Sequence, residues 1–180
     1  MLIRRPFAFM RHGETTLNRE GRVAGRTDCP LTTRGEAQAR AAAAYLAGEW
    51  DVVATSCLVR ARETASLAAP GYPHVALAGL NERDWGEFEG VPLARHPGYL
   101  DTPVGGESWM AFRIRVVDAL NAVLGDYGRP LVVAHSGVFR VVCSVAYGSP
   151  DGERLGHAEP VMIEPVGTAD WRIRSLTQGN

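Results

Sequence analysis

The chain contains no lysine, because all 19 of its basic residues are arginines. Without lysine it cannot form a Walker A phosphate-binding loop, a Lys Schiff base or a Ser–Lys dyad. Cysteine is also scarce: Cys29, Cys57 and Cys143 lie far apart and form neither a CxxC pair nor a zinc-binding spacing. We therefore expect a reduced, intracellular protein.

The chain also lacks an excess of positive or negative charge, and it lacks long apolar runs. The 19 basic residues nearly balance 20 acidic ones, for a formal net charge of −1. This balance argues against a nucleic acid or an anionic membrane as partner, since either would need a basic field. The apolar run at residues 7–10 is too short for a signal peptide, and no stretch approaches the roughly 18 apolar residues of a membrane span. We expect a cytoplasmic location.

The length and composition predict a single domain over residues 1–180. Hydrophobic residues make up 46% of the chain and charged residues 22%, as in ordinary globular proteins. Apolar strand patterns alternate with helical patterns, which predicts an α/β fold: a three-layer sandwich with a mainly parallel central sheet and helices on both faces. The expected strands are residues 6–10, 51–55 and 131–134, and the expected helices are residues 33–46, 57–69, 109–123 and 136–142.

Three further features complete this expected organisation. Thr33 and Glu36 have the spacing of a capping box and predict the start of the first helix. Residues 79–107 are rich in glycine and proline and predict an irregular excursion over the sheet. Residues 161–164 and 171–173, separated by a turn at Gly167, predict a C-terminal hairpin.

Two histidines follow expected strands, and ligands of open α/β sheets bind at the carboxyl ends of strands. His12 follows the first strand beside Arg11, and His135 follows the strand at 131–134. Arg60, near the start of the second helix, can point to the same edge. Two guanidinium groups suit a tetrahedral dianion, and a neutral imidazole can attack phosphorus. Glu82, in the excursion, could protonate a departing oxygen.

Each of these residues also has an ordinary structural interpretation. A lone histidine at a strand end is more often a surface or hydrogen-bonded residue than a nucleophile. Arg60 could be a plain surface charge, since surface cations here must be arginine. His74, His96 and His157 lie in Pro- or Gly-rich segments, and we interpret them as surface residues. The aromatic residues Trp85, Phe88, Tyr99 and Trp109 are interpreted as packing residues, with walls of a substrate pocket as the alternative.

Five blocks of the chain, in order, resemble the signature of the histidine phosphatase superfamily, the phosphoglycerate-mutase-like proteins. They are RHGET with the following GRVAGRTDCPLTTRGEAQA, SCLVRARETA, LNERDWGEFEG, GGES and VVAHSGVFR. The resemblance extends to about residue 147. One such block would be a weak signal, but five in the correct order are specific.

This resemblance implies roles for particular residues. It implies that His12 is the nucleophile that becomes phosphohistidine, and that His135 steadies the transferred phosphoryl group. It implies that Glu82 is the proton donor. Its implied phosphate-binding residues are Arg11, Arg60, Asn18 and, through backbone contacts, Gly25 and Ser136. It also implies no metal and no cofactor, with a small phosphomonoester as substrate; the oligomeric state, monomer or homodimer, stays open.

The superfamily contains both phosphatases and mutases, and we expect hydrolysis. Only 52 residues separate Glu82 from His135 and 45 follow His135, so the chain resembles forms without the covering segments of the sugar-acid mutases. After the second histidine, those mutases typically have the pattern His-Gly-Asn, whereas this chain has His135-Ser136-Gly137. Arg83, directly after the acid, is a feature that mutases often have, so it favours a mutase. Phosphoglycerate mutase-type transfer is therefore the alternative.

Two further hypotheses belong to other classes. A phosphoryl-binding module without turnover is disfavoured by the complete set of His12, Glu82 and His135. A serine-hydrolase elbow is excluded because its G-x-S-x-G pattern needs glycines where Ala134 and Val138 stand.

Overall fold

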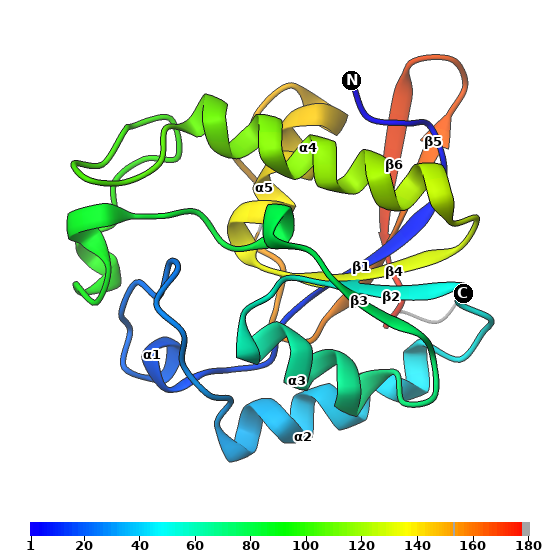
Figure 1. The fold of residues 1–180 in the computed structure, drawn as a ribbon, viewed down its shortest axis with the longest axis horizontal. Coiled ribbons are helices and arrows are strands. Elements are labelled where there is room, and N and C mark those ends of the chain that lie inside the picture. Colours follow the sequence, from blue (N-terminus) through cyan, green and yellow to red (C-terminus); the bar gives the residue numbers. More distant parts are fainter. Residues whose placement is uncertain (153, 178–180) are drawn as a thin grey trace.

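The computed structural model describes residues 1–152 and 154–177, which form one six-stranded sheet between layers of helices (Figure 1). The strand order is β3-β2-β4-β1-β5-β6. Strands β3, β2, β4 and β1 pair in parallel, while β5 pairs antiparallel with β1 and β6 antiparallel with β5. The strands are β1 (Phe7–Arg11), β2 (Val52–Thr55), β3 (His74–Ala76), β4 (Pro130–Ala134), β5 (Pro160–Val166) and β6 (Asp170–Ser175).

Helices cover both faces of this sheet, which confirms the predicted α/β class. In Figure 1, α4 and α5 lie on one side of the strands and α2 and α3 on the other. The helices are α1 (Thr16–Arg19), α2 (Thr33–Ala42), α3 (Val59–Ala68), α4 (Trp109–Asp126) and α5 (Ser136–Tyr147). Short 3-10 turns occupy Ala43–Tyr45, Ala78–Leu80, Gly86–Phe88 and Leu93–Arg95, and three of them lie in or beside the predicted excursion.

Successive residues of the central strands fall into two separate hydrophobic clusters. Phe7, Phe9 and Val132 belong to the cluster that includes residues of α4 and α5. Ala8 and Val133 belong to the cluster that includes residues of α2 and α3. Because side chains along a strand point alternately to opposite faces, a strand between two helical layers must be apolar at every position. The continuous apolar runs in the sequence have this origin.

The structure corrects two local predictions. The first expected helix begins after Thr32, whose hydroxyl accepts a hydrogen bond from the Gly35 N–H at 3.0 Å. The predicted Thr33–Glu36 capping box is therefore wrong, and the Glu36 carboxylate instead accepts from Arg40 at 3.0 Å, one turn along the helix. The sequence analysis also missed β3, a three-residue edge strand.

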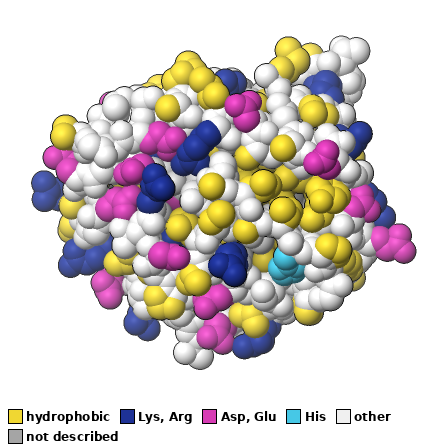
Figure 2. Space-filling view, viewed as in Figure 1, with side chains coloured by type: hydrophobic (Ala, Val, Ile, Leu, Met, Phe, Trp, Pro, Cys, Tyr) yellow, Lys and Arg dark blue, Asp and Glu magenta, His cyan; other side chains and the backbone are white. Residues whose placement is uncertain are grey.

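Charges of both signs are interspersed on the face drawn in Figure 2, where arginine and acidic side chains lie among one another. This agrees with the near-zero net charge of the whole chain. Within residues 1–152 and 154–177, no helix is long and apolar enough to cross a membrane.

Candidate active site

The pairing of β1 with β4 brings the two predicted histidines together. The strands are parallel neighbours with Arg11 opposite Ala134, and the His12 N–H donates to the Ala134 carbonyl at 3.0 Å. The residue after each strand therefore lies at the same sheet edge. The imidazole centroids of His12 and His135 are 5.2 Å apart, and both rings are buried.

The Gly13 carbonyl determines which ring nitrogen of His12 carries the proton. Its Nδ1 lies 2.7 Å from the Gly13 carbonyl oxygen, which can only accept a hydrogen bond. We therefore assign the proton to Nδ1, which leaves a lone pair on Nε2. Burial lowers the pKa of His12 well below its usual 6.5, with further lowering from the Arg60 and Arg11 charges. The imidazole is thus neutral at physiological pH and chemically able to act as a nucleophile.

His135 is the N-cap residue of helix α5 and is completely buried. Its Nε2 lies 2.7 Å from the Ser56 hydroxyl, which follows the end of β2. Burial and the nearby Arg60 charge also lower the pKa of His135 well below 6.5. The sequence analysis missed Ser56 as a partner of this imidazole, because only the pairing of β2 with β4 places the two residues together.

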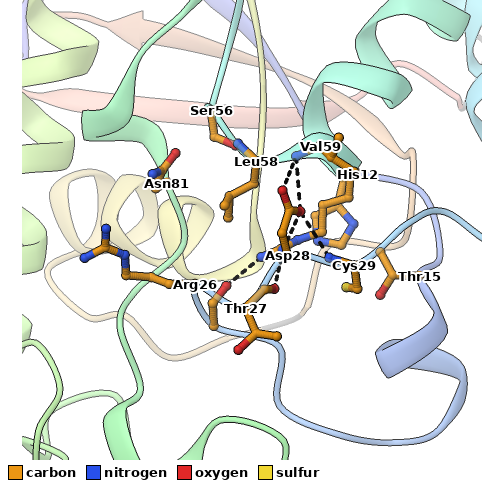
Figure 3. Close-up of polar contacts among 12 residues, drawn as sticks. His12, Thr15, Arg26, Thr27, Asp28, Cys29, Ser56, Leu58, Val59 and Asn81 are labelled. Carbon is orange, nitrogen blue, oxygen red and sulfur yellow. Dashed lines mark hydrogen bonds and ion pairs between the residues drawn. The ribbon is translucent and has the colours of Figure 1, made fainter.

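Arg60 is the second residue of α3, and its guanidinium is completely buried. It donates to the carbonyls of Gly25 at 2.6 Å and Thr27 at 3.0 Å. The Asp28 carboxylate lies 3.7 Å from the guanidinium and accepts from the Val59 N–H at the start of α3, at 2.9 and 3.1 Å (Figure 3). These contacts hold the cation at the sheet edge, so Arg60 is not a plain surface charge.

Arg11 supplies a second cation at the same edge. Its Nη1 donates to the Leu155 carbonyl at 3.1 Å. Burial lowers the pKa of Arg11 to about 10, so the guanidinium stays charged at neutral pH. The buried Arg60 cation and the half-buried Arg11 cation, beside two neutral imidazoles, make an anion-binding environment.

The excursion presents Glu82 to this edge through two backbone hydrogen bonds. One carboxylate oxygen accepts from the Arg83 N–H at 2.8 Å, and the other accepts from the Gly137 N–H in the first turn of α5 at 2.9 Å. The Arg115 side chain of α4 donates to the Glu82 carbonyl at 3.0 Å. The carboxylate is therefore held on both sides, although it belongs to a segment without regular structure.

One cavity of about 200 Å³ joins these groups. Six of the eight predicted site residues line it, namely Arg11, His12, Asn18, Arg60, Glu82 and Ser136. The other two lie outside its lining: His135 is in contact with His12, and the carbonyl of Gly25 holds Arg60. A larger cavity of about 590 Å³ lies beside α3 and β3, but none of the predicted site residues lines it.

The structure also adds residues to the cavity that the sequence analysis had set aside. His96 and His157 are half-exposed and both line it, a place that the sequence analysis did not assign to them. Trp85 and Tyr99 line it as well, whereas the lining does not include Phe88 or Trp109. No local sequence pattern distinguishes His157, because its place depends on how the segment before β5 returns past β1.

Unmet hydrogen-bonding capacity is concentrated around this cavity. Four buried side-chain polar atoms have no partner within the part of the chain that the structure describes. Three of them belong to the site: Arg11 Nε, Arg60 Nε and His135 Nδ1. Because buried polar groups are nearly always paired, such a concentration is typical of a binding or catalytic site.

The comparison with known families agrees with this arrangement. The model of the histidine phosphatase superfamily (branch 1) matches residues 7–159. The chain belongs to this superfamily. The resemblance inferred from the five sequence blocks is thereby confirmed, and residues of four of these blocks, all but GGES, line the one cavity.

Relatives within the superfamily include both phosphatases and mutases. The chain is 32% identical over 177 residues to the uncharacterized phosphatase PhoE of Bacillus subtilis, covering 92% of this chain and 90% of that protein. It is 33% identical over 175 residues to a 2,3-bisphosphoglycerate-dependent phosphoglycerate mutase of Azorhizobium caulinodans, covering 82% and 84%. The solved alpha-ribazole phosphatase of Shigella flexneri superposes with a TM-score of 0.80 at 26% identity, covering 96% of each chain.

Proposed function

We propose that this protein is a metal-independent phosphomonoesterase that hydrolyses a small phosphorylated molecule through a phosphohistidine on His12. The observation that carries the proposal is the environment of His12: a buried imidazole whose Nδ1 faces the Gly13 carbonyl and whose pKa is lowered, beside the buried guanidinium of Arg60 and the half-buried one of Arg11. A neutral nucleophile next to a cationic pocket can approach a phosphate dianion without charge repulsion.

In the first step, His12 Nε2 attacks phosphorus, and the bond from phosphorus to the alcohol oxygen breaks. Glu82, in its protonated form, gives its proton to the departing oxygen, so the alcohol leaves neutral. Arg11 and Arg60 stabilise the charge on the equatorial oxygens, as does the imidazole of His135 in contact with His12.

In the second step, water attacks phosphorus and the N–P bond breaks. The Glu82 carboxylate accepts the proton of the attacking water, and the enzyme returns to its starting state with release of inorganic phosphate. The same carboxylate serves as acid and then as base, which requires that it stay in place between the steps. Its two backbone hydrogen bonds, from Arg83 and Gly137, support this requirement.

The volume of the cavity favours a small substrate. Its volume of about 200 Å³ is below the roughly 300–1,000 Å³ of pockets for drug-sized ligands. Arg22 and Arg154 line it in addition to Arg11 and Arg60, while Glu82 is the one acidic residue among its described lining residues. This charge balance favours an anionic phosphomonoester over a neutral metabolite.

Phosphoglycerate mutase-type transfer is the second candidate, favoured by the mutase relative and by Arg83 after the acid. The environment of Arg83 weakens that argument. Its guanidinium is completely buried and donates to the carbonyls of Tyr99, Asp101 and Glu107 at 2.5–2.9 Å, and it is not among the residues lining the cavity. Arg83 thus stabilises the excursion, a role that a phosphatase needs as much as a mutase.

The test is hydrolysis of p-nitrophenyl phosphate in the presence of EDTA by the wild-type protein and by His12→Ala. His74→Ala, which removes an exposed histidine on β3, is the matched control. We expect turnover by the wild type and by His74→Ala but not by His12→Ala, together with an acid-labile phosphoenzyme in rapidly quenched samples. Equal turnover by His12→Ala, or loss of activity with EDTA, would contradict the proposal.

A second assay separates hydrolysis from mutase activity. The protein is incubated with 3-phosphoglycerate and a catalytic amount of 2,3-bisphosphoglycerate, and both 2-phosphoglycerate and inorganic phosphate are measured. A phosphatase releases phosphate without faster isomerisation. Isomerisation that outpaces phosphate release would establish the mutase alternative.

A further inference from the structure

His157 is a third histidine beside the nucleophile, and the mechanism above does not use it. Its ring centroid lies 6.2 Å from that of His12, and it lines the same cavity. Its Nε2 lies 3.1 Å from the Oδ1 atom of Asn18.

The segment that carries His157 is attached to the end of β1 on both sides of the histidine. Before it, the Leu155 carbonyl accepts from the Arg11 side chain at 3.1 Å. After it, the Ala158 N–H donates to the Arg11 carbonyl at 3.0 Å, and Ala158 adopts a φ of 52°, a left-handed conformation rare for alanine. Tertiary contacts must hold such a residue in place. The imidazole is therefore delivered to the cavity by a preorganised turn.

Asn18 receives two hydrogen bonds on the same atom. Its Oδ1 accepts from the Thr15 N–H at 3.2 Å, within the capping box that begins α1, and lies within hydrogen-bonding distance of His157 Nε2. Because an amide oxygen only accepts, His157 must carry its proton on Nε2. Burial and the Arg11 charge lower the pKa of His157 to about 4, so the imidazole is neutral and this single tautomer persists at physiological pH.

Fixing the oxygen of a side-chain amide also fixes its nitrogen. With Oδ1 turned toward Thr15 and His157, the NH₂ group of Asn18 points away from both donors. Within the described residues, no protein acceptor takes a hydrogen bond from Asn18 Nδ2, and Asn18 lines the cavity. Two amide N–H groups are thus available to an oxyanion in the cavity.

We propose that His157 is a positioning residue of the phosphoryl site: its Nε2–H holds the Asn18 amide in the orientation that presents Nδ2 to a phosphoryl oxygen. Without this donor, only the Thr15 N–H still holds Oδ1, so the amide flips more readily and turns its oxygen toward the anion, which is repulsive. This proposal rests on the proposed function, since it assigns a role within the same site.

The test is a double-mutant cycle with p-nitrophenyl phosphate as substrate and inorganic phosphate as competitive inhibitor. His157→Phe keeps a ring but removes the donor, whereas His157→Gln keeps an N–H donor. We expect His157→Phe to lower kcat/KM and to weaken phosphate inhibition by about tenfold each, the effect of one hydrogen bond. His157→Gln should restore most of both values.

The same substitution in an Asn18→Ala background separates positioning from direct contact. If His157 acts through Asn18, His157→Phe has no further effect there. An equal loss in both backgrounds, or a His157→Gln variant as impaired as His157→Phe, would overturn the proposal. His74→Phe, on the distant edge strand, is the control for loss of a histidine.

A measurement without turnover keeps this proposal separate from the proposed function. Long-range ¹H–¹⁵N spectra of the wild-type protein report which imidazole nitrogen carries the proton. We expect a neutral His157 with its proton on Nε2 between about pH 5 and 8, and a proton on Nδ1 would overturn the assignment. If the protein shows this tautomer but neither turnover nor a phosphoenzyme, the proposed function is wrong, while the hydrogen bond from His157 to Asn18 is still supported.

Discussion

Arg115 offers the sharpest test of how the excursion holds Glu82. From α4, its guanidinium makes two hydrogen bonds to the Glu107 carboxylate, at 2.7 and 2.8 Å. It also donates to the carbonyls of Gly79, Asn81 and Glu82 at 2.8–3.0 Å. One side chain thus makes five hydrogen bonds to the segment around the proposed acid. We predict that Arg115→Lys destabilises the protein and slows catalysis.

The magnitude follows from the donors that are lost. A lysine ammonium has three N–H donors and a single nitrogen, so it can replace at most three of the five contacts and cannot match the paired geometry with Glu107. Losing two charge-assisted hydrogen bonds at about 1.5 kcal/mol each lowers the free energy of unfolding by about 3 kcal/mol. Arg113→Lys is the matched control on the same helix, since the Arg113 side chain makes one long hydrogen bond, 3.3 Å to Ser144. We expect it to cost under about 1 kcal/mol.

The assay is urea unfolding of both variants at pH 7, together with kcat for an alkyl phosphate. Arg115 does not line the cavity, so a loss of kcat must arise through the segment that carries Glu82. We expect at least a tenfold drop for Arg115→Lys and almost none for Arg113→Lys. Free energies of unfolding that agree within about 1 kcal/mol for the two variants would refute this reasoning.

Three other predictions concern the same site. Glu82→Gln should slow hydrolysis of alkyl phosphates far more than that of p-nitrophenyl phosphate, whose leaving group needs little protonation; uniform slowing would contradict the role of an acid. Gly137→Ala should lower kcat at least tenfold, because the added Cβ would collide with the Glu82 carboxylate, whereas Gly125→Ala meets open space and should keep full activity. The free energy of unfolding should fall as pH drops below about 6.5, because the unfolded chain binds protons that the neutral native His12 and His135 do not; His135→Gln should reduce this slope by up to about 1.4 kcal/mol per pH unit, and an unchanged slope would show that His135 is not held neutral.

The sequence analysis predicted the layered fold because its signals are local. An apolar strand between two helical layers must be apolar at every position, and the runs at 7–10 and 131–134 meet this condition. The histidine after each run was then predictable as a sheet-edge residue. The short edge strand β3 escaped detection because its residues are partly exposed and carry no apolar run.

The predicted N-cap of α2, Thr33, was wrong by one residue, because the sequence offers two equivalent candidates. Thr32 and Thr33 both satisfy the pattern of a helix start, and a one-dimensional pattern cannot choose between them. Tertiary contacts hold Thr32 in that position: its N–H donates to the Glu14 carbonyl at 2.9 Å and its hydroxyl to the Glu14 carboxylate at 2.8 Å.

By itself, the sequence determined the fold class and the superfamily and predicted the site residues, since each of these predictions rests on a short block or a periodic pattern. Only the tertiary structure decided the environment of those residues. The protonation state of His12 depends on the Gly13 carbonyl and on burial, and His157 reaches Asn18 across 139 positions of sequence. Burial, charge and hydrogen bonding arise from segments far apart in the chain, so no local pattern can encode them.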